Sequence, residues 1–532
     1  MVKVTCYGGV NEIGGNQILV EDGDVKFFFD FGTPFARWNQ FYEEFLRPRR
    51  GAGILDPLTM GLLPPIRGLY RADLEYPQNI WNQVKSRHGF RDLTKANISG
   101  VLLSHAHLDH CGYISFLKHN IPVYSSAATA FIAKAIQDTS GGNEFEKEVC
   151  YFSPRSLRQD YLGSDRDVRH QRRFKMVDIN NLSKRALLFW NHRCKMGQWE
   201  PIQQLQQPEF QPKTIGRLPL LSFPVDHSIP GALAYAVETS AGWIAYTGDI
   251  RKHGLESQKT KEFIEKLKEL KVTLLICEGT RVDDVKSISE EEVYENCLKS
   301  VKDARGKLII ADFGPRNIER LRIFLEIAKA TGRKLVILSK DAYLLECLAH
   351  VMPEVCLSDQ LKDMVVYQER KDPNSLKAWE RDIRDRLPLV KHSDVSQYPG
   401  NFILCFSFWD IKHLIDINIT GGLYIYSASE VYNEEQAMDI RRLHNWLDAF
   451  NFQKIGLPVE LEKGKWEVPE EQSGFHASGH ASGKDILDMV KEINPKILIP
   501  VHTERPQFFI EKLKDTRIEV RIAIQGQPEV IT

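Results

Sequence analysis

Short apolar runs, spaced along the chain and followed by polar residues, predict a protein built from many strands. Val2–Cys6, Gln17–Val20 and Val25–Asp30 have the length and side chains of strands, and Gly8–Gly15 predicts a glycine-rich turn. The other strand-like runs outside the middle of the chain are Val101–Leu103, Val123–Tyr124, Ala234–Val237, Trp243–Tyr246, Val272–Cys277 and Lys496–Val501.

Segments with helical periodicity lie between some of these strands. In Thr260–Leu270, apolar residues recur at the spacing of one helix face. Ser482 with Asp485 resembles a capping box, and the apolar residues behind it predict a second amphipathic helix. Strands that alternate with helices indicate an α/β fold.

A second α/β unit is predicted from about Ser287 to Gln472, and its charged stretch Gln368–Arg386 predicts a solvated helix. Residues 35–92 and 151–218, which are rich in Arg and turn-forming or aromatic residues, are interpreted as insertions. The strands of the second unit are expected at Lys307–Asp312, Lys334–Ser339, Phe402–Phe406 and Leu423–Ser427, and its helices at Asn317–Lys329 and Ala342–Val351.

Composition places the chain among globular proteins of several domains. Its 532 residues correspond to about two to four domains. Hydrophobic residues make up 42% and charged residues 27%, which is ordinary for a globular fold. Lys and Arg number 70 and Asp and Glu 71, so the formal net charge is −1. This balance excludes a protein coated with positive charge, but it does not exclude a local basic groove.

Cysteine usage and the apolar pattern bear on the compartment. The nine cysteines include no CxxC pair, so neither a zinc ribbon nor a secreted disulfide framework is expected. Cys277 and Cys405 are predicted to be buried thiols. The chain starts without the apolar segment of a signal peptide, and no apolar run approaches about 20 residues. We therefore expect a cytoplasmic protein without membrane spans.

The strongest chemical signal is the segment Ser-His-Ala-His-Leu-Asp-His at residues 104–110, directly after a predicted strand. His105 and His107 point the same way on an extended segment, because the side-chain period is two, so they can hold one metal ion together. Asp109 and His110, where the chain turns, can reach a second ion. This density of ligands after a buried strand predicts metal binding rather than a surface histidine cluster.

Further candidate ligands follow other predicted strands, at the edge where an α/β sheet places its functional groups. Any one of them alone is a common polar strand end, but their recurrence predicts one shared site. They are Asp30, His227, Asp249, Glu278 and His502.

These motifs resemble the metallo-β-lactamase fold and, within it, the β-CASP nucleases. Glu278 in Cys-Glu-Gly-Thr, His480 in Ser-Gly-His-Ala-Ser and His502 in Pro-Val-His-Thr-Glu are similar to motifs A, B and C of that group. The opening Gly8–Asn16 and the segment His227–Pro230 look most like ribonuclease J. The resemblance covers nearly the whole chain.

The resemblance implies an α/β fold, an αββα sandwich with an inserted β-CASP domain. The lactamase-like domain would consist of residues 1–280, with the insertions near 35–92 and 151–218, and of residues 474–532. The inserted domain would consist of residues 281–473. One divalent ion would be held by His105, His107 and His227 and the other by Asp109, His110 and His502, with Asp249 bridging them and Asp30 in support. Zinc suits these ligands, and manganese is chemically admissible.

The resemblance also implies a reaction, the hydrolysis of a phosphodiester by a hydroxide that two metal ions activate. Asp249 would bridge the ions, and Glu278 and His480 are the candidates that assist the leaving oxygen. Cleavage in endonuclease mode and in 5′–3′ exonuclease mode both stay open.

Contacts to RNA are expected at places that the sequence does not rank. Residues 151–175, with Arg169, Arg172 and Arg173, combine cations and aromatic side chains as in surfaces that bind single strands, although a solvated basic face explains the pattern equally well. The stretch 47–71, rich in Arg and Pro, is the next candidate. Hydroxyl groups offer another way to hold phosphate, and the candidates are Ser407, Ser427, Ser478 and Ser482.

We therefore expect a metal-dependent ribonuclease that favours single-stranded RNA. His502 argues against a DNA nuclease of the Artemis-like branch, which usually lacks this histidine. A small-molecule hydrolase would need neither His480 nor the inserted domain, and the intact ligands argue against a non-catalytic RNA-binding subunit. DNA as a substrate and the oligomeric state stay open.

Overall fold

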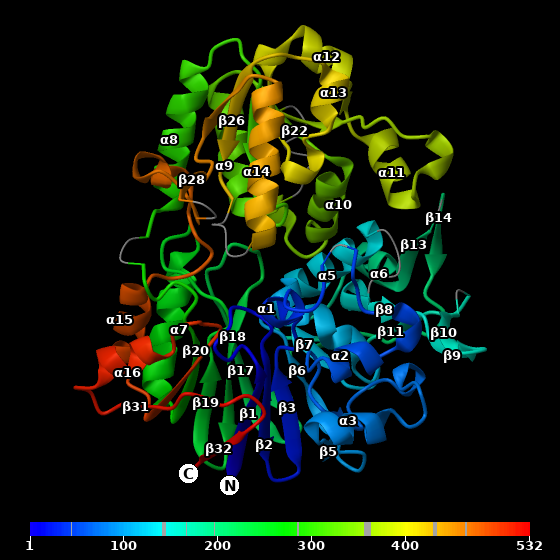
Figure 1. Cartoon of the computed structure of the whole chain (residues 1–532), viewed down its shortest axis with the longest axis vertical. Helices are drawn as coiled ribbons and strands as arrows, with labels where there is room; N and C mark the ends of the chain where they lie inside the picture. The colour runs from blue at the N-terminus through cyan, green and yellow to red at the C-terminus, as the bar shows by residue number, and fades with distance from the viewer. Residues whose placement is uncertain are drawn as a thin grey trace.

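The computed structural model describes residues 1–43, 45–140, 145–165, 167–195, 197–284, 287–355, 363–428, 434–462 and 465–532. Two facing sheets form the lower half of the view in Figure 1, a third sheet with its helices forms the upper half, and both termini lie at the lower edge. Within these ranges, no helix is long and apolar enough to cross a lipid bilayer.

The first sheet has eight strands and contains the start of the chain. The predicted strands lie at its centre. The sheet also includes β12 and β15, which belong to the insertion 151–218, so this insertion adds two strands to one edge of the sheet. In spatial order the strands are β15 (Glu209–Phe210), β12 (Phe174–Met176), β7 (Val123–Ser125), β6 (Ile98–Leu102), β3 (Val25–Phe29), β2 (Gln17–Asp22), β1 (Val2–Gly8) and β32 (Pro528–Ile531).

The second sheet faces the first, and apolar side chains from both sheets fill the space between them. Val4, Ile18 and Phe29 of the first sheet and Tyr235 and Ile499 of the second are fully buried in this core. In spatial order the strands are β16 (Thr214–Ile215), β17 (Leu218–Pro224), β18 (Leu233–Thr239), β19 (Gly242–Tyr246), β20 (Leu274–Glu278), β30 (Ile497–Val501) and β31 (Glu519–Val520).

Helices cover the outer faces of both sheets and complete four layers. The predicted cap is present in α15 (Gly483–Ile493), where the Ser482 hydroxyl accepts from the Asp485 amide and the apolar face is buried. α7 (Ser257–Leu270), α15 and α16 (Gln507–Leu513) pack on the second sheet, and α5 (Ala127–Thr139) packs on the first. The expected αββα sandwich is therefore present.

Apart from β16, which joins the second sheet, the remainder of the two insertions forms short elements outside the two main sheets. In residues 35–92 these are α1 (Phe35–Trp38), α2 (Leu55–Thr59), β4 (Ile66–Arg67), α3 (Ile80–His88) and β5 (Arg91–Asp92). In residues 151–218 they are β8 (Tyr151–Phe152), β9 (Arg155–Arg158), β10 (Tyr161–Ser164), β11 (His170–Gln171), α6 (Lys184–Asn191), β13 (His192–Lys195) and β14 (Gln198–Pro201).

The third sheet is parallel throughout and lies inside the predicted inserted domain, whose boundaries at residues 281 and 473 stay a prediction. Its strands, in spatial order, are β24 (Leu389–Val390), β23 (Met364–Tyr367), β22 (Lys334–Ile337), β25 (Phe402–Cys405), β21 (Ile309–Asp312), β26 (Gly422–Tyr426) and β27 (Phe452–Ile455). Its helices are α8 (Glu290–Asp303), α9 (Ile318–Ala330), α10 (Ser339–Leu348), α11 (Ala378–Arg386), α12 (His392–Gln397), α13 (His413–Ile417) and α14 (Glu434–Ala449), and a hairpin of β28 (Val459–Glu462) and β29 (Lys465–Glu467) follows.

The solvated helix expected over Gln368–Arg386 is wrong in extent and in exposure. Helix α11 covers only the second half of this stretch, because Asp372 caps a 3₁₀ turn at Pro373–Ser375 that interrupts any longer helix. Trp379 and Ile383 of α11 are buried and belong to a hydrophobic core.

A buried network of charges joins the inserted unit to the sandwich. Arg251, just after β19, contacts Asp226 at 2.9 Å and Glu290 at 3.0 Å, and it also pairs with Glu319 of α9. Glu290, the first residue of α8, pairs in turn with Arg320 at 2.9 Å. Arg251 and Arg320 are fully buried, so the carboxylates around them depend on these guanidinium groups for charge balance.

We expect Arg251→Met to destabilise the protein strongly, because it leaves buried carboxylates without their cation. Breaking a buried pair in this way costs about 3–5 kcal/mol. The matched control is Arg442→Met, which removes an exposed pair with Asp439 on α14 and should have little effect. Urea unfolding followed by circular dichroism measures both variants, and equal midpoints for the two would contradict the role of the network.

Candidate metal centre

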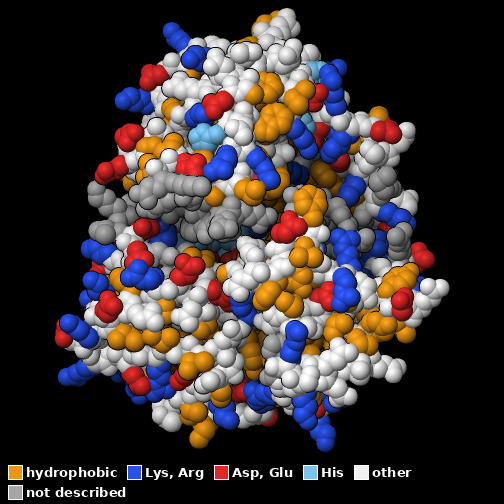
Figure 2. Space-filling model, viewed as in Figure 1, with side chains coloured by type: hydrophobic (Ala, Val, Ile, Leu, Met, Phe, Trp, Pro, Cys, Tyr) orange, Lys and Arg blue, Asp and Glu red, His pale blue; other side chains and the backbone are white. Residues whose placement is uncertain are grey.

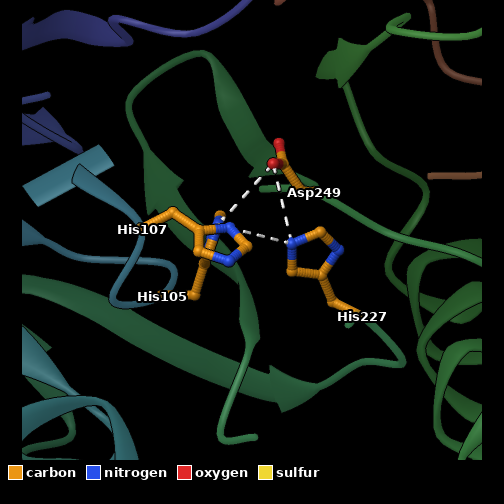
Figure 3. Close-up of side chains that lie close together, drawn as sticks. All are labelled: His105, His107, His227 and Asp249. Atoms are coloured by element: carbon orange, nitrogen blue, oxygen red, sulfur yellow. Dashed lines mark hydrogen bonds and ion pairs between the residues drawn. The ribbon is translucent and has the colours of Figure 1, made fainter. Parts of the chain in front are cut away.

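The centre starts in the histidine-rich segment that follows β6. The chain is extended through His105 and His107 and then turns into α4 (Leu108–Cys111). His107 Nδ1 lies 2.9 Å from His105 Nε2 and 3.3 Å from His227 Nε2. Figure 3 shows these three rings and Asp249 turned toward one another. The three imidazoles present their nitrogens to one point, which is what a shared metal ion requires.

A second group of possible ligands lies beside the first. His502 follows β30 in a left-handed backbone conformation, with φ of +53°, and its ring stacks on that of His110. His502 Nε2 lies 3.3 Å from Asp109 Oδ2, and His110 Nε2 lies 3.6 Å from the same oxygen. The candidate ligand atoms of these three residues lie within 4.8 Å of one another.

Asp249, which follows β19, lies between the two groups. Its Oδ2 is 3.6 Å from His105 Nε2 and 3.2 Å from His110 Nε2, while its Oδ1 is 3.7 Å from His502 Nε2. The carboxylate is 2% exposed. One buried carboxylate therefore faces imidazoles from both groups, as expected of a bridging ligand.

Hydrogen bonds to Nδ1 fix which ring nitrogen each histidine offers. His110 donates to Asp30 Oδ2 at 2.7 Å, and His227 donates to the Gly479 carbonyl at 2.6 Å. The Thr280 hydroxyl donates to a carboxylate and so accepts from His502 Nδ1 at 2.9 Å. In each ring the lone pair of Nε2 is left for another partner, which is the tautomer that metal-binding histidines adopt.

Asp30 organises the layer behind the ligands. It accepts hydrogen bonds from the Ser104 amide at 2.7 Å, the Ser104 hydroxyl at 2.8 Å and the Tyr246 hydroxyl at 2.7 Å. The Ser104 hydroxyl thereby accepts from His105 Nδ1 at 3.0 Å, which completes the same pattern for a fourth histidine. Asp30 thus lies directly behind the ligands, and its supporting role stays a prediction.

The electrostatics of the two groups differ. Burial, together with neighbouring imidazoles, holds the pKa of His105 and His107 well below its usual range, and burial lowers the pKa of His227 to about 4. Burial alone would also lower the pKa of His110, but the carboxylates of Asp249, Asp109 and Asp30 raise it well above the ordinary value. The first group therefore offers neutral imidazoles, the form that binds metal ions.

Two further observations indicate that these side chains fit a metal ion. His110 Nε2 and Asp249 Oδ1 are buried and have no hydrogen-bond partner among the described residues. Buried polar atoms without partners are rare, and a ligand explains them where they converge. Imidazole nitrogen with carboxylate oxygen is a donor set that suits zinc.

Glu278 and His480 form a pair at the edge of the centre. His480 Nδ1 lies 2.9 Å from Glu278 Oε2, and its Nε2 lies 3.9 Å from Asp249 Oδ2. Although burial lowers the pKa of His480, the carboxylates of Glu278 and Asp249 raise it to about 9. The possible ligand atoms of a third group, Asp249, Glu278 and His480, also lie within 4.8 Å of one another. The direct contact of His480 with Glu278 nevertheless indicates that these two residues act as a pair.

Several residues that shape the centre were not among the predicted ones. Gly32 lies so close to the ligand segment that a Cβ atom would meet the Asp109 carbonyl oxygen at 1.6 Å. Thr280 contacts the ligand His502, and Tyr246 contacts Asp30 behind the ligands. Thr280 stands inside the Cys-Glu-Gly-Thr motif and could have been found there. Arg316, between β21 and α9, adds positive charge that contributes to the low pKa of His107, and no motif pointed to it.

The arginines predicted to contact RNA in residues 151–175 are largely engaged in the fold. Arg172 is fully buried, and its guanidinium donates to the carbonyls of Leu117 and Ser115, so its prediction as an RNA contact is wrong. Arg173 is paired with Glu209, and Arg169 donates to backbone carbonyls of its own loop. Arg166 of this stretch lies outside the described residues.

The hydroxyl groups predicted to hold phosphate are also engaged. Ser427 is buried and bonds to the Phe475 carbonyl and to Arg320, and Ser482 is a buried helix cap, so both predictions are wrong. Ser478 accepts from the His480 amide, and Ser407 donates to Asp410 at 2.6 Å. His476, which contacts two backbone carbonyls, is a structural residue.

Comparisons with known proteins agree with this geometry. The sequence profile of the RMMBL family, described as a Zn-dependent metallo-hydrolase RNA specificity domain, matches residues 473–523. Ribonuclease J of Mycolicibacterium smegmatis is 26% identical over 94% of this chain and 68% of the relative. Ribonuclease J of Sinorhizobium meliloti is 23% identical over 77% of this chain and 58% of the relative.

The fold is shared with a solved structure. The crystal structure of a protein of unknown function from Enterococcus faecalis superposes with a TM-score of 0.65 at 21% identity and covers 99% of both chains. The curated relatives extend beyond the matched region, since this chain spans 58 to 68% of the length of the two described above. From the four-layer sandwich, the inserted α/β unit, the converging ligands and these matches, we conclude that the chain is similar to the β-CASP nucleases of the metallo-β-lactamase fold and, among them, to ribonuclease J.

Proposed function

We propose that the protein is a ribonuclease that depends on two divalent metal ions and hydrolyses phosphodiester bonds of RNA. The observation that carries this proposal is the set of imidazoles whose Nδ1 atoms are tied to the fold and whose Nε2 atoms converge on Asp249. The names of the relatives and the description of the matched RNA specificity domain support RNA as the substrate.

His105, His107 and His227 would hold one ion and Asp109, His110 and His502 the other, with Asp249 positioned to contact both. When bound, the ions would supply an activated water molecule as the nucleophile and neutralise charge on the phosphate. Zinc suits the donor set, and manganese is chemically admissible.

His480 is the residue we assign to the leaving oxygen. Its Nδ1 is held by Glu278, so its Nε2 is left to face the site. Glu278 is itself fixed, because Oε1 accepts from the Ile250 amide at 2.8 Å and Oε2 accepts from the Thr280 hydroxyl at 2.6 Å. Glu278 therefore orients His480, and His480 donates a hydrogen bond or a proton to the departing 3′-oxygen.

Removal of a central ligand should remove metal and activity together. We expect the purified protein to contain about two divalent ions per chain, and we expect His107→Ala and Asp249→Ala to lower this content and abolish RNA cleavage. His444→Gln, which changes a histidine of the inserted unit, is the control and should keep both. Elemental analysis after dialysis measures the content, and a metal-free protein that stays active would contradict the centre.

Changes at the Glu278–His480 pair should slow cleavage without loss of metal. We expect Glu278→Gln and His480→Gln to reduce kcat by about 10²–10⁴-fold, the usual contribution of general acid–base catalysis. Single-turnover cleavage and elemental analysis of the same preparations separate the two effects. If either variant loses metal, that residue is a ligand, and if kcat is unchanged, the assigned role is wrong.

Substrate class is tested with matched single strands of RNA and DNA of one sequence, each labelled at either end. We expect faster hydrolysis of RNA, since His502 and the ribonuclease J-like segments favour the RNA-acting branch. The positions of the labels in the products also show whether cleavage starts at an end or inside the strand. Equal or faster hydrolysis of DNA would favour a DNA nuclease instead.

A further inference from the structure

A cavity of about 260 Å³ is lined in part by the segment that carries the candidate metal ligands. Its floor includes Leu108, which stands between the ligands His107 and Asp109, and Thr33, whose amide donates to the Leu108 carbonyl at 2.9 Å. Tyr113, which follows α4, also lines it. Anything bound in this cavity therefore lies against the segment that carries the ligands.

The walls combine aromatic rings with cations. The insertion 35–92 contributes Phe35 and Trp38 of α1 and the arginines of the Arg47–Arg50 stretch, and Lys147 also lines the cavity. Among the lining residues that the structure describes, no side chain is acidic. Phe35 is 40% exposed, so one of its faces is available to a ligand.

This combination matches one kind of ligand, a nucleotide of a single strand. Aromatic side chains stack on bases of any sequence, and cations alongside them neutralise the phosphates. The cavity is smaller than pockets that enclose a whole small molecule, which span roughly 300–1,000 Å³. It therefore suits one unit of a longer chain, and its contact with the ligand segment favours the strand being cleaved as that chain.

Other cations of the described residues are dispersed or paired. On the face drawn in Figure 2, Lys and Arg are interspersed with Asp and Glu rather than gathered into one large patch. Arg173 and Lys175 of the stretch 151–175 share Glu209 as their partner. In the cavity, Arg49 is paired with Asp56, whereas Arg50 is exposed and makes no ion pair with a described residue.

We propose that this cavity is a nucleotide subsite for single-stranded RNA, in which Phe35 stacks on a base and Arg50 contacts a phosphate close to the scissile bond. The proposal rests on the proposed ribonuclease function, because it takes the bound strand to be the substrate. It assigns a role in substrate recognition to the insertion 35–92.

The test measures RNA binding without cleavage. The full-length protein in excess EDTA is titrated with a fluorescein-labelled single-stranded RNA, and anisotropy gives the affinity between about 50 and 200 mM salt. We expect Phe35→Ala to weaken binding by roughly 5- to 100-fold with an unchanged salt slope, since it removes stacking but no charge. We expect Arg50→Gln to weaken binding and to reduce the salt slope by about 0.7, the contribution of one phosphate on a single strand.

Two matched controls keep the comparison specific. Tyr398→Ala removes an aromatic ring that is 54% exposed on the inserted unit, and Arg442→Gln removes a cation that is 54% exposed on α14. Both should leave affinity and salt slope unchanged. Circular dichroism of all four variants verifies that they are folded.

Photo-crosslinking gives a second measurement that does not depend on affinity. RNA with 4-thiouridine near the cleavage position should crosslink to a peptide that contains Phe35, as identified by mass spectrometry. The subsite is overturned if both subsite variants keep their RNA affinity and the crosslinks lie only elsewhere. Cleavage of RNA by the unaltered protein would in that case still support the proposed ribonuclease function. If the unaltered protein neither binds nor cleaves RNA, the proposed function itself fails. Weaker binding of an oligoglutamate peptide by the variants, with RNA affinity intact, would overturn the proposal in favour of an acidic protein partner.

Discussion

The charge of Asp249 is the constraint on which the centre depends. A carboxylate that is 2% exposed is strongly unfavourable unless cations or hydrogen bonds compensate it. Nothing but imidazole nitrogens lies near enough among the described residues to do so directly, and one oxygen has no hydrogen-bond partner. Burial would raise the pKa of Asp249, but the neighbouring histidines, His110 foremost, hold it well below its ordinary value. Metal ions held by these imidazoles would add positive charge beside the Asp249 carboxylate.

The need to balance buried charge also connects the inserted unit to the candidate metal centre. Arg251 lies two residues after Asp249 and balances carboxylates from both parts of the molecule. It also donates to the Ser478 carbonyl at 3.4 Å, and the next residue, Gly479, accepts from His227. The loop that carries His480 is therefore fixed by the contact between the two units. The docking of the inserted unit is therefore coupled to the positions of His227 and His480.

The sequence was informative where function depends on local spacing. His105, His107, Asp109 and His110 lie close together in the chain, and the other ligands follow strands, so the edge of the sheets brings them together. Arg172 shows where this reasoning stops. It stands in a basic and aromatic stretch, yet its guanidinium is buried and holds backbone carbonyls of a segment more than fifty residues away. Whether an arginine faces solvent or caps carbonyls depends on contacts between distant segments, which spacing in one sequence does not contain. Ser427 was misjudged for the same reason.

The insertion 35–92 is attached to the chemistry by backbone hydrogen bonds, not only by proximity. The Phe31 and Thr33 amides donate to the carbonyls of His110 and Leu108, at 2.9 Å in each case, directly before α1 begins. A side chain at Gly32 would collide with the backbone at Asp109, so the two backbone segments approach as closely as backbones can. Displacement of α1 would therefore pull on the segment that carries Asp109 and His110. Because metal ligands must be positioned to within a fraction of an ångström, these backbone contacts tie the position of α1 to the geometry of the metal ligands.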